Sequence, residues 1–254
     1  MRIVACYANK GGTGKTAAAV NLAYAFAASG QRTLLCDLDP QGASGFYFRV
    51  KPSRKLTETR FFKDADRFVD AIRGSDYDNL DILPSNASFR DFDVFLSGMK
   101  NARSRLKKAL KAVRGDYDTV LLDCPPNISM LSENVLRAAD AVVVPVIPTT
   151  LSQRTFEQLL EFFGEHDLPA AKIHAFFSMV QATKKLHGDL IAAMALAHPA
   201  RFMQAQIPFA SEIERMGLTR APVLATAPNS AAGKAYRALF EELRGRLAGD
   251  DPAP

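Results

Sequence analysis

A glycine-rich stretch near the start of the chain places two lysines and two threonines among three glycines. Residues 10–16 read KGGTGKT. Glycine has no β-carbon, so its backbone can wrap closely around phosphates and point N–H groups at them. A lysine at the end of such a loop reaches the β- and γ-phosphates, and the hydroxyl that follows binds Mg²⁺. The pattern predicts a phosphate-binding loop (P-loop) that contacts a nucleotide through Gly11, Gly12, Thr13, Gly14, Lys15, Thr16 and Ala17.

The sequence on either side of this loop supports the prediction. Residues 3–7 are short, apolar and rich in strand formers, and residues 15–30 have helical spacing and end on a glycine suited to a helix C-cap. One position departs from the usual G-x-x-x-x-G-K-[ST] pattern, because Asn9 replaces the first glycine and Lys10 follows it. The alternative is an ordinary glycine-rich turn between a strand and a helix.

Three aspartates follow apolar runs that read as buried strands. Asp123 ends TVLLD, where it could accept from Thr16 or from a magnesium-bound water. The alternative is that Asp123 only caps the next turn. Asp37 and Asp39 lie in LLCDLD, and alternation along a strand would place both carboxylates on one face. Like charges so close require a cation nearby, and Mg²⁺ would supply it.

Further apolar runs alternate with helical patterns along the chain. Strands are expected at 32–39, 80–84, 118–126, 141–148 and 172–180, and helices at 131–139, 152–164, 183–197 and 229–247. Strands that are apolar throughout favour an α/β fold with a mostly parallel central sheet and helices on both faces. We expect one domain over residues 1–248 and a disordered tail over 249–254.

Two charged segments are harder to interpret. Residues 46–79 are mixed in character, with a plausible helix at 61–73 and no readable role. Residues 100–114 carry seven Lys/Arg and no acid, and an apolar stripe predicts an amphipathic helix with a cationic outer face. That stripe consists of Leu106, Leu110 and Val113.

Composition limits the classes of protein to consider. The chain has 254 residues, 48% of them apolar, and no apolar run approaches the roughly 20 residues that span a bilayer. The N-terminus lacks a signal-peptide pattern, so we expect a cytoplasmic protein. The three cysteines are far apart without a C-x-x-C pair, which favours small buried hydrophobes over a zinc or redox site. The formal net charge of +5 is compatible with an anionic partner.

Together these motifs resemble the ParA/MinD family of deviant Walker ATPases. The resemblance rests on KGGTGKT at 10–16, DLDPQG at 37–42, DCPP at 123–126 and IPFASEIERMGLTRAPV at 207–223, and DLDPQG is closer to the ParA side. It implies that Asp39 positions the lytic water and that Asp37 supports the metal site. It also implies that Asp123 is the Walker B residue and that the loop opening at Pro208 borders the adenine. ATP and Mg²⁺ are the implied cofactors.

The family resemblance also gives Lys10 a role. It matches the signature lysine, which in such proteins crosses to the ATP of a second subunit, so that catalysis depends on a nucleotide-sandwich homodimer. The alternative is that Lys10 adds phosphate-binding charge within its own subunit. The family often has a hydroxyl residue after the P-loop threonine, and Ala17 lacks it, which could lower nucleotide affinity.

Non-specific DNA is the partner that the resemblance implies for the ATP dimer, through basic residues in the C-terminal half. The candidates are Lys184, Lys185, Arg201, Arg215 and Arg220. Solvated surface charge is the alternative for each. The implied protein hydrolyses ATP slowly, is stimulated by an unidentified activator, associates with the nucleoid when ATP-bound, and partitions or positions a cargo that the sequence does not name.

Two other functions compete with this interpretation. A MinD-like protein would cycle on a membrane through a terminal amphipathic helix, but anionic lipid would repel the acids near this C-terminus. Those acids are Glu241, Glu242, Asp250 and Asp251. A metabolic enzyme on the same scaffold would need bridging cysteines or a glutaminase domain, and the sequence shows no sign of either. We therefore expect no membrane partner.

Overall fold

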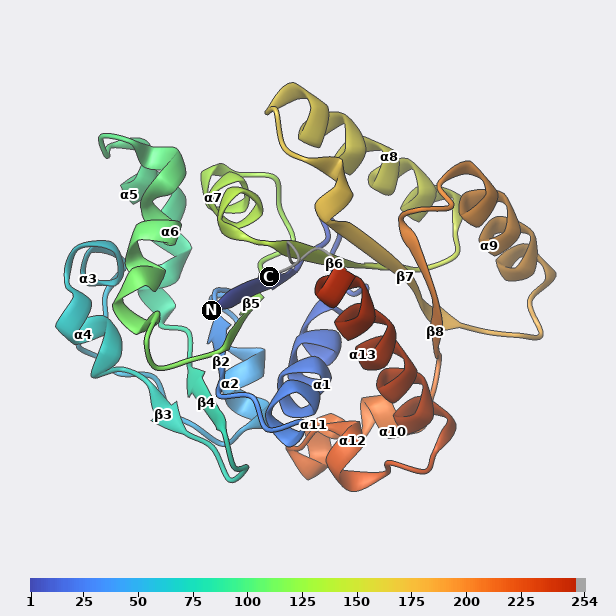
Figure 1. Ribbon diagram of the computed structural model, residues 1–254, viewed down its shortest axis with the longest axis horizontal. Coiled ribbons are helices and arrows are strands. Elements are labelled where there is room, and N and C mark those ends of the chain that lie inside the picture. Colours follow the sequence, from blue (N-terminus) through green and yellow to red (C-terminus); the bar gives the residue numbers. More distant parts are fainter. Residues whose placement is uncertain (250–254) are drawn as a thin grey trace.

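The computed structural model describes residues 1–249 and contains one sheet of eight strands (Figure 1). Its strand order is β3-β4-β2-β5-β1-β6-β7-β8. All neighbours pair in parallel except β3 and β4, which are antiparallel. The strands are β1 (Arg2–Cys6), β2 (Thr33–Asp37), β3 (Arg73–Gly74), β4 (Leu80–Leu83), β5 (Thr119–Asp123), β6 (Ala141–Val146), β7 (Ile173–Val180) and β8 (Phe202–Pro208). The mostly parallel α/β sheet predicted from the sequence is confirmed.

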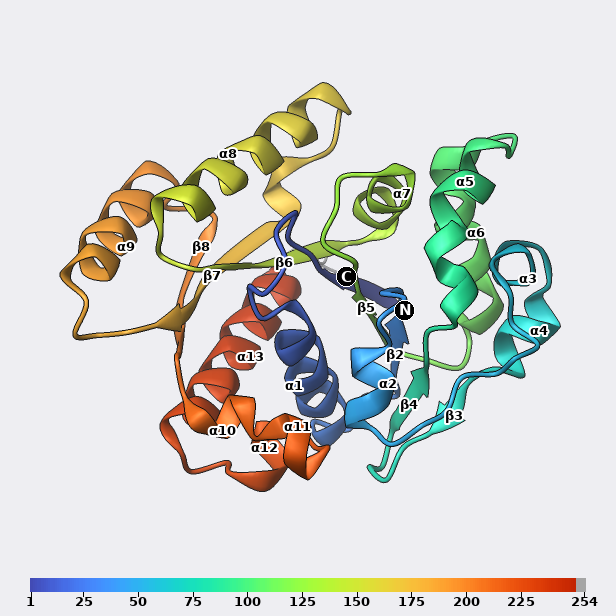
Figure 2. The same ribbon diagram turned by 180° about the vertical axis from the view of Figure 1, so that it is seen from behind.

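Helices cover both faces of this sheet, as Figures 1 and 2 show from opposite sides. One face carries α7 (Met130–Ala138), α8 (Thr150–Glu165) and α9 (Lys185–Ala197). The other carries α1 (Lys15–Ala28), α12 (Val223–Thr226) and α13 (Ala231–Gly249). The helices predicted at α1, α7, α8, α9 and α13 are confirmed within a few residues.

Alternation along the strands divides the buried side chains between two cores. In β5, Val120 and Leu122 pack into the core under α7 and α8, whereas Leu121 packs into the core under α1 and α13. Successive side chains of a strand point to opposite faces, and a sheet covered twice needs apolar residues on both. This requirement explains the uninterrupted apolar runs in the central strands.

Strand β8 lies outside every strand predicted from the sequence. Its outer positions Gln204 and Gln206 are exposed, because β8 is an edge strand. The polar residues interrupt the apolar run that identified the central strands. The two-residue strand β3 at the other edge was also missed and is too short to leave a periodic pattern.

The helix predicted at 61–73 is wrong. The chain forms two short helices instead, α3 (Glu58–Lys63) and α4 (Ala65–Val69), and then enters β3. Asp64 separates the helices: its backbone is extended, and its side chain accepts a hydrogen bond from the Arg67 N–H at 3.0 Å as the α4 cap. Both helices are held by buried phenylalanines, with the rings of Phe61 and Phe68 5.1 Å apart.

The continuous helix predicted at 100–114 is also wrong. Asn101 has a left-handed backbone (φ 55°), and the segment forms a 3₁₀ turn at Ala102–Ser104, helix α6 (Arg105–Ala109) and a second 3₁₀ turn at Leu110–Val113. The predicted apolar stripe nevertheless faces the core, since Leu106, Leu110 and Val113 are fully buried. The periodicity therefore identified the buried face and missed the breaks in hydrogen bonding.

Short helices complete the described chain. They are α2 (Ala43–Tyr47), α5 (Phe92–Ser97), α10 (Ser211–Glu214) and α11 (Met216–Thr219), with further 3₁₀ turns at Ala87–Asp91 and Ala170–Lys172. Helix α13 still includes Gly249, and the remaining residues of the tail expected at 249–254 lie outside the described residues. Within residues 1–249 no helix is long and apolar enough to cross a bilayer.

Candidate nucleotide-binding site

The P-loop connects the end of β1 to the start of α1, as predicted. Gly12 and Gly14 have left-handed backbones with φ of 70° and 95°. A β-carbon on Gly14 would also lie 2.9 Å from the Ser178 Oγ on β7, closer than side chains pack. Gly14 is therefore required both by its dihedral angle and by the close approach of β7.

Lys15 folds back over the loop that precedes it. Its side chain is buried, and its Nζ donates a hydrogen bond to the carbonyl oxygen of Lys10 at 3.2 Å. Burial lowers the pKa of Lys15, and the charge of Asp123 partly opposes this change. The ammonium group is thus held at the loop, close to a buried carboxylate.

Two buried aspartates end adjacent strands below the loop. Asp37 on β2 and Asp123 on β5 are register partners, and neither is exposed to solvent. The Thr16 hydroxyl donates to one oxygen of Asp123 at 3.3 Å. The Ser44 hydroxyl donates to the other at 2.8 Å. The structure therefore brings together all three predicted metal-site residues.

Ser44 was not identified from the sequence. It is fully buried on α2, just after DLDPQG, where a lone serine carries no distinctive spacing. Its hydrogen bond fixes the second oxygen of Asp123 and leaves the first facing Thr16.

The aspartate pair is costly to ionise without a cation. Burial raises the pKa of Asp123 to about 6, although hydrogen bonds from Ser44 and Thr16 lower it. Burial and the neighbouring charge of Asp123 raise the pKa of Asp37 well above its ordinary value. Two buried carboxylates and a hydroxyl form the hard oxygen set that Mg²⁺ prefers.

Asp39 lies beyond the strand that was expected to carry it. Strand β2 ends at Asp37, so Asp39 is in the following turn, half-exposed, and its Oδ1 accepts from the Gln41 N–H at 3.0 Å. The expectation that strand alternation aligns the two carboxylates is wrong for this reason. Asp39 is still close enough for its charge to raise the pKa of Asp123.

Pro208 ends β8, which is separated from β1 by β6 and β7. The segment after it packs against α1 through Asn21. The Asn21 amide donates to the Met216 sulfur at 3.5 Å and accepts from the Leu224 N–H at 3.1 Å. The contact with Met216 links the 207–223 motif, and that with Leu224 the residue after it, to the helix that follows the P-loop. The contact of Pro208 with adenine stays a prediction.

The predicted DNA-binding residues fall at two different ends of the sheet. Lys184 and Lys185 are exposed between the carboxyl end of β7 and the start of α9. Arg201 precedes β8 at the opposite, amino end, and its Nη1 donates to the Ala170 carbonyl at 2.6 Å. One flat contact cannot use all three.

Arg220 is half-buried, whereas Arg215 is exposed. The Arg220 Nε donates to the Phe46 carbonyl at 2.9 Å, and its guanidinium carbon lies 4.6 Å from the Phe46 ring centre. Arg49 in turn donates to the Arg220 carbonyl at 2.6 Å. These contacts join α11 to the end of α2, so we call them the Arg49–Arg220 clasp.

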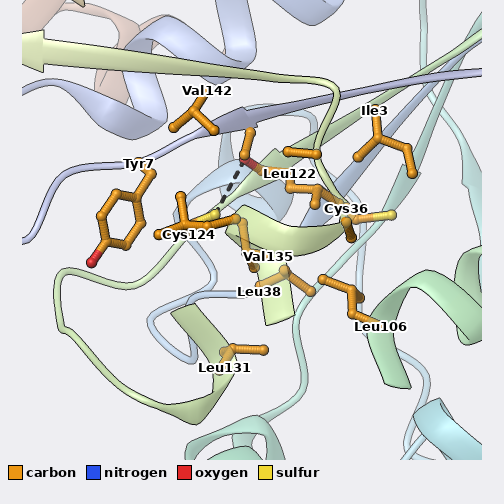
Figure 3. Packing of buried hydrophobic residues seen from close by; sticks show 14 of the residues in the cluster. Ile3, Tyr7, Cys36, Leu38, Leu106, Leu122, Cys124, Leu131, Val135 and Val142 are labelled. Atoms are coloured by element: carbon orange, nitrogen blue, oxygen red, sulfur yellow. Dashed lines mark hydrogen bonds between the residues drawn. The ribbon is translucent and has the colours of Figure 1, made fainter. Parts of the chain in front are cut away.

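All three cysteines are buried and free, as predicted. Figure 3 shows Cys124 within the core under α7, with its Sγ 3.6 Å from the Leu122 carbonyl oxygen, and Cys36 close to the same apolar side chains. Burial raises the pKa of the Cys6 and Cys124 thiols well above the ordinary value, so both are neutral and unreactive.

The fold and the site together define a P-loop nucleotide-binding protein. Its marks are a parallel sheet, a glycine-rich loop that enters a helix, and an aspartate at the end of the neighbouring strand.

Comparison with known proteins agrees with this class. A family model described as AAA domain matches residues 1–169. Soj, the sporulation initiation inhibitor protein of Bacillus subtilis, is 37% identical over 147 residues. The alignment covers 57% of this chain and 58% of Soj.

Two further relatives extend this likeness. The chromosome partitioning protein ParA of Caulobacter vibrioides is 38% identical over 58% of this chain and 56% of its own length. The cell division protein PomZ of Myxococcus xanthus is 30% identical over 94% of this chain and 76% of its own length. The chain therefore belongs to the ParA/MinD family of P-loop ATPases, close to the ParA partitioning ATPases. It spans little more than half the length of Soj and ParA.

Solved structures share the fold. The ATP complex of an McdA variant from Cyanothece superposes with a TM-score of 0.85 at 19% identity, covering 100% of this chain and 99% of McdA. Cobyrinic acid a,c-diamide synthase of Mycobacterium smegmatis, with bound ADP and magnesium, gives a TM-score of 0.81 at 24% identity, covering 100% and 98%.

Proposed function

We propose that the protein is an ATPase that binds ATP with Mg²⁺ at the P-loop. The observation that carries this proposal is the meeting of Thr16, Asp37 and Asp123, with the charge of Asp123 near enough to Lys15 to affect its pKa. Solved relatives of the same fold hold ATP, or ADP with magnesium, which supports the choice of ligands. Bound Mg²⁺ would neutralise the aspartate pair and polarise the phosphates.

The side chains have separate roles in this proposal. Lys15 and the loop N–H groups bind the β- and γ-phosphates, and Thr16 and Asp123 orient the metal site. Asp39, half-exposed in its turn, accepts a hydrogen bond from the attacking water and orients it. Lys10 is held only through its carbonyl oxygen among the described residues, so its ammonium group is available to the ATP of a second subunit.

In this proposal, ATP hydrolysis switches the protein between a DNA-bound and a released state. The ATP-bound chain forms a sandwich dimer, binds DNA without sequence preference, and releases it after a slow hydrolysis that a partner stimulates. Soj, ParA and PomZ are named for sporulation, chromosome partitioning and cell division, which supports a role in partitioning or positioning a cargo. Lys184, Lys185 and Arg215 are the exposed basic residues at the carboxyl end of the sheet that suit the DNA contact.

The experiment that tests the site replaces Lys15. Lys15→Ala removes the buried ammonium, so ATP affinity measured by calorimetry with Mg²⁺ should fall at least tenfold, with hydrolysis lost. Lys10→Ala is the matched control, because it removes a lysine of the same loop and should leave the affinity of one chain for ATP within about threefold. Unchanged binding by Lys15→Ala would remove the proposed site.

A further inference from the structure

A cationic cleft lies at the β3 edge of the sheet, far from the P-loop. It has a volume of about 460 Å³ and is lined by Pro52, Ser53, Arg54, Lys55, Arg67, Asp70 and Arg73. Four of these residues are cationic and one is acidic. Figure 1 shows the elements around it, α3, α4 and β3, at the side of the molecule opposite α9.

The structure holds the Arg73 guanidinium and the backbone that carries Arg54 and Lys55 in place. The Arg73 Nη1 donates to the carbonyl oxygens of Asp70 and Ile72 at 2.8 and 2.9 Å, so its other N–H groups keep one orientation. Arg60 donates to the Lys55 carbonyl at 2.9 Å and fixes the loop that carries Arg54 and Lys55. A guanidinium fixed in this way loses less entropy when it binds an anion.

The acids nearby do not neutralise this charge. Residues 51–73 contain seven Lys/Arg and four Asp/Glu. Asp64 is occupied as the cap of α4. Asp70, the acid in the cleft, lies 3.5 Å from one nitrogen of Arg67, in an exposed pair that water screens.

The basic segment 100–114 extends the same surface. Helix α6 packs on α3, and the 3₁₀ turn at Leu110–Val113 packs on α4. Six of the seven cations of this segment are exposed. The charge of Lys107 lowers the pKa of Lys172, so Lys107 lies toward the start of β7 and away from the cleft. The exposed cations that follow it are Lys108, Lys111 and Arg114. We name the cleft residues together with these three the β3-edge surface.

We propose that the β3-edge surface binds the phosphate backbone of nucleic acid, independently of ATP. Within residues 51–73 and 100–114, Val69 is the single large apolar side chain that is exposed. Protein interfaces are anchored by buried aromatic and apolar groups, whereas phosphate binding needs only spaced cations. All the residues belong to one subunit, so the contact needs neither nucleotide nor dimer. This goes beyond the proposed function, in which DNA binding follows ATP.

The position of the surface separates it from Lys184 and Lys185. Lys184 and Lys185 follow β7, which is six strand spacings from β3 in the sheet. At about 4.8 Å between neighbouring strands, β3 and β7 are roughly 29 Å apart. The two basic surfaces can therefore contact different segments of nucleic acid at once.

Fluorescence anisotropy with a labelled random-sequence DNA duplex tests the proposal on the wild-type chain without nucleotide. Binding should be weak and strongly salt-dependent. Arg54→Glu/Lys55→Glu should weaken it at least tenfold and reduce the slope of log affinity against log salt by about 2, because each phosphate contact contributes about 0.9. The matched control is Lys234→Glu/Arg237→Glu on the exposed face of α13, which changes the net charge equally and should lower affinity less than threefold.

The outcomes separate this proposal from the ATP-dependent function. Lys184→Glu/Lys185→Glu should leave the nucleotide-free binding intact and lower only the increment that ATP adds. The β3-edge surface would be overturned if the Arg54/Lys55 and Lys234/Arg237 double variants lost DNA affinity equally. It would also be overturned if the wild-type chain did not bind DNA at all without nucleotide. Stronger competition by poly-glutamate than by unlabelled DNA would overturn nucleic acid as its ligand. Absence of the ATP increment alone would count against the proposed function only.

Discussion

Asp123 couples the stability of the ligand-free protein to pH. Its pKa is raised by burial from 3.8 to about 6, so between these values the folded chain keeps a proton that the unfolded chain has lost. Stability without metal therefore falls as pH rises through this window, by up to about 1.4 kcal/mol per pH unit. Above this pH window, the ionised carboxylate of Asp123 stays buried and lowers the stability of the folded chain until a cation binds.

Asp123→Asn tests this coupling. The amide is neutral at every pH. In EDTA, the gain in unfolding free energy of the variant over wild type should therefore be about 2 kcal/mol larger at pH 7.5 than at pH 4.5. Urea unfolding at the two values measures the difference. Mg²⁺ with ATP should stabilise wild type and not the variant. If the difference in unfolding free energy between the variant and wild type were the same at both pH values, the raised pKa of Asp123 would be contradicted.

Individual site residues were predictable to different degrees. Lys15, Thr16 and Asp123 follow from motif spacing, because a P-loop and a strand-end carboxylate have fixed positions in a parallel sheet. The role of Ser44 could not be predicted, because it depends on how α2 packs against Asp123 and not on a sequence motif around Ser44. Asp39 was placed by its motif, although the geometric reason given for it failed when β2 ended two residues earlier.

At the scale of elements, the central strands were predictable and the edges were not. Strands buried on both faces leave unbroken apolar runs, whereas β8 mixes exposed glutamines with buried residues. The single helices predicted at 61–73 and 100–114 were wrong. Capping by Asp64 divides the first segment. The second begins after a left-handed Asn101 and forms 3₁₀ turns on both sides of α6. Such local breaks do not change the spacing of the apolar residues, so the hydrophobic pattern of the sequence does not reveal them.

The Arg49–Arg220 clasp gives a prediction for α2 and α11. Arg220→Ala removes the hydrogen bond to Phe46 and the contact with its ring, and should lower the free energy of unfolding by about 1 kcal/mol. In a double-mutant cycle with Phe46→Ala, the two losses should be non-additive by about 0.5 kcal/mol. Urea unfolding measures both.

Arg215→Ala is the control for the clasp, since Arg215 is exposed and should change stability little. Strict additivity in the cycle would show that the clasp does not hold α11 to α2. A loss of DNA affinity in Arg220→Ala without any loss of stability would instead favour the DNA contact predicted from the sequence.

At the scale of the whole molecule, the central question is whether Lys10 acts within its own subunit or across a dimer. Lys10→Ala and Asp39→Ala should each lack ATPase activity alone. Mixed in equal amounts, they should recover up to about a quarter of wild-type turnover, because half of the dimers are mixed and each of these has one complete site. Steady-state phosphate release, with light scattering to count dimers, measures the recovery.

A lysine that acts within its own subunit predicts no recovery, because neither chain then contains both groups. Zero activity while mixed dimers are present would therefore contradict the trans role of Lys10. Lys10→Ala mixed with Lys10→Ala/Asp39→Ala provides the control, since no site in that mixture is complete.

The close approach of Ser178 on β7 to Gly14 bears on where this chain can be divided. The matched AAA domain ends at residue 169, before β7, so a fragment cut there would leave the P-loop without the strand that packs against it. It would also expose the edge of β6 and remove α13 from the core beside α1. The end of the matched family model is thus not a boundary of folding, and a working fragment must extend through the last helix.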